Sequence, residues 1–189
     1  GFVPPILRKH LKGQGGKKIL PSVVCGVVED HASTNKNKDI LDAFEAPMSI
    51  GLLWAHVDVL ERHWSLPNLI DEYSLRDRVK VTLTGNLTDT EMSYYYSACD
   101  VTLLPSVEGF GFPIAESLAC GVPVAHGSYG GGNWGLPTVR YVNQIAMRTE
   151  GVFNCTRPVF AAGDWHVAIE GFKGPSVEDC RASVEHLDW

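Results

Sequence analysis

The sequence lacks the features of a membrane-spanning or secreted chain. No apolar run approaches the roughly 20 residues that a helix needs to cross a bilayer. Residues 1–18 are basic and glycine-rich instead of apolar, which is unlike a signal peptide. The five cysteines are scattered and form no Cys-x-x-Cys pair, which disfavours a zinc site or a disulfide framework. These absences predict a cytoplasmic protein with reduced thiols, with attachment of the full-length protein to a membrane periphery as an alternative.

An excess of positive charge is also lacking. The chain has 16 Lys and Arg against 22 Asp and Glu, a net charge of −6. A general nucleic-acid binder would carry a basic face, so we expect no nucleic-acid partner. No Asp-x-Asp motif and no histidine group with ligand spacing occurs, so we expect no metal. A single anionic ligand remains compatible with this charge, because a local site needs few donors.

What the chain does have is a regular alternation of apolar segments of strand length and amphipathic segments of helix length. The expected strands span residues 22–29, 50–57, 79–83, 101–104 and 122–125. The expected helices span residues 38–46, 66–73, 88–98, 113–120, 164–172 and 176–187. Thr88 with Glu91 and Ser176 with Asp179 fit caps at two helix starts, and Gly121 fits a cap at the end of the helix at 113–120. This order predicts an α/β fold with a Rossmann-like parallel sheet and helices on both faces. With no internal repeat and no low-complexity linker, residues 1–189 are expected to form a single domain.

A glycine-rich segment follows the fourth expected strand and reads PSVEGFGFPIAESLACGVPVA from Pro105. Ligands of parallel sheets bind outside the carboxyl ends of the strands, where this loop begins. Gly109 and Gly111 can adopt positive φ, which lets backbone N–H groups face a bound group closely. Pro113 suits the first turn of a helix, whose N-terminus would attract a phosphate.

Two acids frame this expected phosphate site, Glu108 in the loop and Glu116 in the expected first turn of the helix. A carboxylate is unfavourable beside a diphosphate, but it can accept hydrogen bonds from sugar or ribose hydroxyls. A lone Gly-x-Gly is more often a simple turn, yet its combination with a strand end, a helix start and two acids favours a ligand site. For the later segment Gly130-Gly131-Gly132, the sequence leaves two alternatives, approach to the ligand or a plain turn.

The Glu-x7-Glu spacing from Glu108 to Glu116, together with the surrounding prolines and glycines, resembles the signature of the family 4 glycosyltransferases (glycosyl transferases group 1) of the GT-B fold. The segments 85–101 and 36–44 are also similar to the family, so the resemblance covers roughly residues 23–142. It implies the C-terminal, donor-binding domain of a two-domain enzyme whose substrate is a nucleoside diphosphate sugar, such as a UDP- or GDP-linked one, with no other cofactor.

The resemblance also implies roles for individual residues. Two positions carry catalytic roles, Glu108 at the hydroxyls of the donor sugar and Lys38 at the diphosphate. Glu116 corresponds to the acid that binds the ribose hydroxyls. The remaining substrate-binding positions are the main-chain amides of Gly109, Phe110 and Gly111, the nucleobase loop Gly85, Asn86 and Leu87, and Lys36. The family's basic pair includes an arginine about five residues before Lys38, whereas residues 31–34 here are His, Ala, Ser and Thr.

The reaction implied is a metal-independent, retaining transfer of a hexosyl group to an acceptor hydroxyl. The acceptor, a glycan, lipid or protein, would be bound by an N-terminal domain that this chain lacks. We therefore expect the isolated chain to bind the donor with little or no transferase activity. Two alternatives stay open: a GT-B nucleotide-sugar epimerase, and a non-catalytic nucleotide-sugar-binding module, which the missing arginine and the missing domain favour. The sugar, the base and the acceptor are not specified by the sequence.

Overall fold

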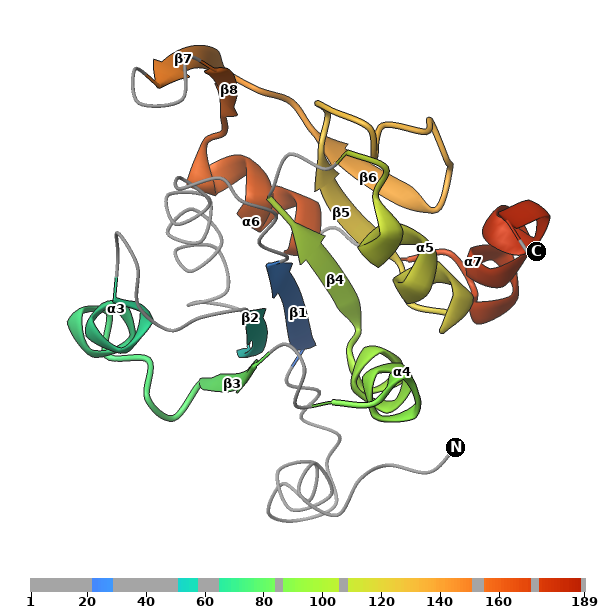
Figure 1. The fold of residues 1–189 in the computed structure, drawn as a ribbon, viewed down its shortest axis with the longest axis horizontal. Helices are drawn as coiled ribbons and strands as arrows, with labels where there is room; N and C mark the ends of the chain where they lie inside the picture. Colours follow the sequence, from blue (N-terminus) through green and yellow to red (C-terminus); the bar gives the residue numbers. More distant parts are fainter. Residues whose placement is uncertain are drawn as a thin grey trace.

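A six-stranded parallel sheet forms the centre of the molecule (Figure 1). The computed structural model describes residues 22–28, 51–57, 65–83, 87–105, 109–150, 155–170 and 174–187. The strand order is β3-β2-β1-β4-β5-β6. The strands are β1 (Ser22–Val28), β2 (Gly51–Val57), β3 (Val79–Leu83), β4 (Val101–Leu104), β5 (Val124–Gly127) and β6 (Val139–Val142). This arrangement confirms the predicted Rossmann-like α/β fold.

Helices cover both faces of the sheet, and the strands supply each face with apolar side chains by simple alternation. Along β4, Val101 and Leu103 enter one buried cluster and Leu104 enters the other. The first cluster also takes residues of α3 (Leu66–Glu72) and α6 (Ala162–Glu170). The second takes residues of α4 (Asp89–Ala98), α5 (Phe112–Ala119) and α7 (Val177–Val184). A short 3₁₀ helix, η2 (Glu185–Leu187), follows α7.

Local capping sets the starts of two helices where the sequence predicts them. In α4, Glu91 N donates to Thr88 Oγ1 over 3.3 Å, and Thr88 N donates to Glu91 Oε2 over 2.8 Å. The backbone hydrogen bond from Thr88 lowers the pKa of Glu91. Ser176 and Asp179 form the same reciprocal pair at α7. Each reciprocal pair accepts hydrogen bonds from N–H groups at the helix start that have no partner within the helix.

Three strands were not predicted from the sequence. β6 buries only its ends, Val139 and Val142, so it carries no continuous apolar run. β7 (Ala146–Glu150) and β8 (Cys155–Val159) form a separate antiparallel pair, and residues 146–149 are all exposed. The strand predicted at 122–125 begins at Val124, two residues later than expected, because Val122 N still donates to Ser117 O after α5. The helix expected at 38–46 lies outside the described residues.

A buried chain of hydrogen bonds ties α5 to the sheet. Ser117 Oγ donates to Val122 O over 2.9 Å, and Thr102 Oγ1 on β4 lies 2.7 Å from Ser117 Oγ. Because the Ser117 proton serves Val122, the Thr102 hydroxyl is the donor in the second bond. Both side chains are fully buried. This chain fixes the helix that carries the candidate site against the strand that precedes it.

Breaking these two hydrogen bonds is expected to destabilise the fold in a non-additive way. Ser117→Ala should cost about 1–3 kcal/mol, because it leaves the buried Thr102 hydroxyl without its acceptor. Adding Thr102→Val removes that hydroxyl, so the double variant should be less destabilised than the sum of the single variants. Urea unfolding of the two single variants and the double variant measures this coupling. Strictly additive costs would show that the two hydroxyls do not interact.

Candidate functional site

The strand order places one glycine loop at the point where ligands bind in doubly wound sheets. From β1 the chain adds β2 and β3 on one side, whereas β4 pairs with the opposite side of β1. Such a reversal opens a crevice outside the carboxyl ends of the two neighbouring strands. The segment with Gly109 and Gly111 follows β4 and leads into α5. It therefore lies at the edge where this crevice is expected.

The loop enters α5 through a left-handed residue. Gly111 is the N-cap of α5 with φ of 100°, and it offers no side-chain cap. Pro113 occupies the first turn, as predicted. Gly111 thus uses the positive φ that the sequence allowed at this position. A Cβ at Gly109 would meet nothing within 4 Å, which leaves open space beside its backbone.

A second glycine segment packs directly against this loop. A Cβ on Gly131 would overlap the carbonyl oxygen of Gly109. A Cβ on Gly132 would lie 2.6 Å from both His126 Nε2 and Ile114 Cδ1. Residues 130–132 are thus more than a plain turn, because they support the loop that leads into α5. The sequence could not reveal this contact, since it joins two backbones about 20 residues apart that carry no side chains.

Glu116 lies one residue further along α5 than the sequence suggested, and so falls just beyond the first turn. The helix begins at Phe112, so Glu116 is its fifth residue and no acid occupies the first turn. Its carboxylate oxygen Oε2 accepts a hydrogen bond of 3.1 Å from Tyr96 Oη on α4. Tyr96 is 1% exposed, whereas Glu116 is exposed. No role was predicted for Tyr96, although three consecutive tyrosines on a helix imply that one of them packs inward.

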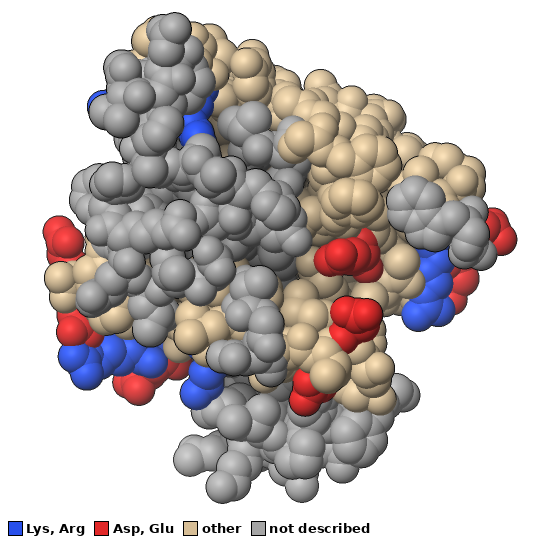
Figure 2. Space-filling model, in the orientation of Figure 1, with Lys and Arg blue, Asp and Glu red and all other residues tan. Residues whose placement is uncertain are grey.

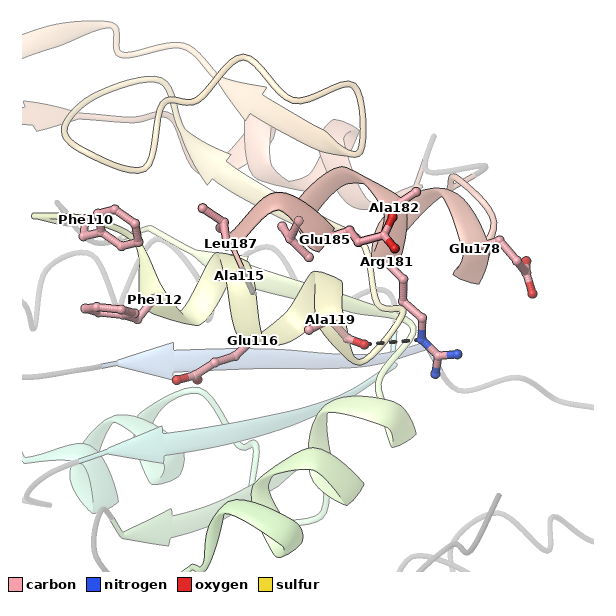
Figure 3. Close-up of a pocket in the computed structure, with 11 residues that line it drawn as sticks. Phe110, Phe112, Ala115, Glu116, Ala119, Glu178, Arg181, Ala182, Glu185 and Leu187 are labelled. Carbon is pink, nitrogen blue, oxygen red and sulfur yellow. Dashed lines mark hydrogen bonds between the residues drawn. The ribbon is translucent and has the colours of Figure 1, made fainter. Parts of the chain in front are cut away.

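A groove of about 800 Å³ runs between α5 and the α7–η2 segment. Figure 3 shows Phe110, Phe112 and Glu116 toward one end of it and Glu178 toward the other. Phe110 and Phe112 are 44% and 48% exposed, and their ring centroids are 4.8 Å apart. The Phe110 ring also lies 5.2 Å from that of Trp134, beyond the second glycine segment. Exposed aromatic surface therefore borders the glycine loop.

Basic side chains do not gather around the middle of the face shown in Figure 2 among the described residues. Lys and Arg lie toward its edges there, and acidic side chains lie nearer its centre. Among these residues, no group of three or more His, Cys, Asp or Glu is arranged to hold a metal ion. The part of the chain that the structure describes also contains no helix long and apolar enough to span a membrane.

The predicted site residues fall into two groups. Gly109, Phe110, Gly111 and Glu116 lie together at the start of α5. Leu87 precedes the Thr88 cap of α4 and packs partly buried against the second apolar cluster. The other predicted positions lie outside the described residues: Lys36, Lys38, Gly85, Asn86 and Glu108.

Comparison with known proteins agrees with this architecture. Residues 61–133, which include the glycine loop and Glu116, match the family model described as Glycosyl transferases group 1. Over this segment the chain is similar to the group 1 glycosyltransferases. A D-inositol 3-phosphate glycosyltransferase from Mycobacterium sp. (strain KMS) is 32% identical over 125 residues, which is 65% of this chain and 25% of that protein.

Solved GT-B glycosyltransferases share the fold of this chain. WaaG, a glycosyltransferase involved in lipopolysaccharide biosynthesis, has a TM-score of 0.63 at 14% identity, over 95% of this chain and 45% of WaaG. Anabaena HepE in complex with UDP-glucose has a TM-score of 0.59 at 17% identity, over 88% of this chain and 44% of HepE. The chain thus spans less than half the length of these solved relatives, and about a quarter of the Mycobacterium one.

Proposed function

We propose that this chain is the donor-binding domain of a retaining hexosyltransferase that uses a nucleoside diphosphate sugar. The observation that carries the proposal is the position of the glycine loop and the α5 N-terminus beside the reversal of strand order. Backbone N–H groups and the positive end of a helix favour a diphosphate there. The similarity in fold to HepE, which was solved with UDP-glucose, supports this ligand class.

The individual contacts that we propose are those that the family resemblance implies. The amides of Gly109, Phe110 and Gly111 bind the sugar and phosphate region, because the space beside Gly109 is open. Glu116 accepts hydrogen bonds from the ribose hydroxyls. Glu108 binds hydroxyls of the donor sugar. Leu87, with Gly85 and Asn86, borders the nucleobase.

Charge stabilisation would drive the transfer step. As the bond between the sugar and the diphosphate breaks, positive charge develops on the sugar ring and negative charge on the departing diphosphate. Lys36, Lys38 and the N–H groups at the start of α5 would stabilise the diphosphate. An acceptor hydroxyl then attacks the anomeric carbon from the face that the diphosphate leaves and gives its proton to the departing diphosphate, so the configuration is retained. The acceptor would bind a second domain, so we propose that this chain alone binds the donor without transferring it.

Calorimetric titration with UDP, GDP, UDP-glucose and GDP-mannose tests the proposal. We expect saturable binding of one nucleotide and its sugar, which also identifies the base. Glu116→Ala should weaken this binding at least about tenfold, because hydrogen bonds to a charged group contribute about 1.5–3 kcal/mol each.

Glu178→Ala is the matched control, because Glu178 is an exposed acid at the other end of the same groove. It removes the same charge and should leave the affinity unchanged. A folded wild-type chain that binds none of the four nucleotides would contradict the proposal. Equal losses in the two variants would instead indicate a general effect of charge and no specific contact by Glu116.

A further inference from the structure

A buried tyrosine holds the exposed acid of the candidate site. Tyr96 lies on α4 with 1% of its surface exposed. Its ring meets Trp54 edge-on, with ring centroids 6.1 Å apart and planes at 84°. Its hydroxyl reaches across to α5 and donates to Glu116 Oε2 over 3.1 Å. A donor that is fixed by core packing therefore restrains a carboxylate at the molecular surface.

This restraint matters for ligand binding because it limits the conformations that an exposed glutamate side chain can adopt. Ordering a free side chain of this type at the moment of binding costs conformational entropy, and a chain that is already ordered avoids this cost. The oxygens of a carboxylate act only as acceptors, which suits them to the donor hydroxyls of a ribose. A carboxylate has about four acceptor positions, and the Tyr96 bond uses one of them at Oε2.

The geometry points to Tyr96 as a positioning residue that holds Glu116 in place for the ribose hydroxyls, and so makes the site selective for ribonucleotides over their deoxy forms. This inference rests on the proposed function, because it requires a nucleotide at Glu116. It adds a residue that touches no ligand itself and acts through the carboxylate. A merely structural role for Tyr96 would instead affect all nucleotides equally.

The test compares UDP and GDP with 2′,3′-dideoxy-UDP and 2′,3′-dideoxy-GDP by calorimetry on the 189-residue chain. For the base that binds, Tyr96→Phe should weaken the ribonucleotide about three- to tenfold, the effect of one hydrogen bond. The dideoxy form, which lacks both hydroxyls, should bind wild type and Tyr96→Phe equally. The double variant Tyr96→Phe/Glu116→Ala should bind the ribonucleotide no more weakly than Glu116→Ala does.

Tyr95→Phe is the matched control. Tyr95 is adjacent on α4 and stacks on Trp54 with centroids 4.5 Å apart, so this change removes a neighbouring hydroxyl while keeping the ring. Tyr95→Phe should change the affinity for neither the ribonucleotide nor its dideoxy form. Equal losses for ribo and dideoxy forms in Tyr96→Phe would overturn the inference while leaving the proposed function intact. Failure of wild type to bind any nucleotide would overturn both.

A second variant keeps the inference testable if Tyr96→Phe does not fold. Glu116→Asp retains the charge but withdraws the carboxylate from Tyr96 by one methylene group. Its preference for the ribonucleotide over the dideoxy form should fall close to that of Glu116→Ala. A wild-type preference in Glu116→Asp would show that the carboxylate needs no positioning, and would overturn the inference.

Discussion

Gly131→Ala is expected to abolish most nucleotide binding and to destabilise the chain. The added Cβ would overlap the carbonyl oxygen of Gly109, so one of the two glycine segments must move. Both contacting groups are backbone, which cannot rotate away as a side chain does. We expect a stability loss of about 1–3 kcal/mol from overpacking. Nucleotide affinity should fall at least about tenfold, because the displaced loop carries the proposed amide contacts.

Thermal unfolding and calorimetric titration of the same sample measure the two effects. Gly163→Ala is the control, because a Cβ at Gly163 meets nothing within 4 Å and the residue lies in α6. Alanine is the better helix former, so this variant should match or slightly exceed wild-type stability and bind normally. Wild-type stability and affinity in Gly131→Ala would show that the two glycine segments are not in contact.

Trp165→Ala is expected to give the largest loss of stability without a matching loss of affinity. Trp165 is fully buried on α6 and meets the Phe160 ring edge-on, with centroids 5.6 Å apart. Removing this side chain should cost about 3–5 kcal/mol. Folded domains of this kind are stable by about 5–15 kcal/mol, so much of the total would be lost. The residue belongs to the cluster on the opposite sheet face from α5, so the remaining folded protein should bind nucleotide normally.

Urea unfolding measures this loss, and Trp165→Phe separates packing from hydrogen bonding. The buried Trp165 Nε1 has no hydrogen-bond partner among the described residues. Replacing the indole with a phenyl ring therefore breaks no described hydrogen bond and keeps an aromatic ring against Phe160. The cost should be well below that of the alanine variant. A loss as large as that of Trp165→Ala would indicate that Nε1 makes an important hydrogen bond.

Features that depend on near neighbours in the chain could be predicted from the sequence. The capping pairs Thr88–Glu91 and Ser176–Asp179 are each three residues apart, and the structure confirms both. Gly121, with φ of 82°, directly follows the C-cap of α5 as predicted. Alternation of apolar strand-length segments and amphipathic helix-length segments was enough for the fold class, because central strands such as β4 and β5 are buried along their whole length. The strands β6, β7 and β8 were not predicted from the sequence, because few of their described side chains are buried.

The sequence by itself therefore determined the layered α/β fold, the proline in the first turn of α5, and the glycine-rich loop before it. Only the tertiary structure decided that Tyr96 reaches Glu116 and that Gly131 supports Gly109. These pairs are about 20 residues apart, and strand order and helix placement bring them together. The physical reason is that the hydrogen bonds of caps and turns form between residues a few positions apart. A site, in contrast, is assembled when distant elements pack together, and the sequence of one element does not specify which other element it contacts.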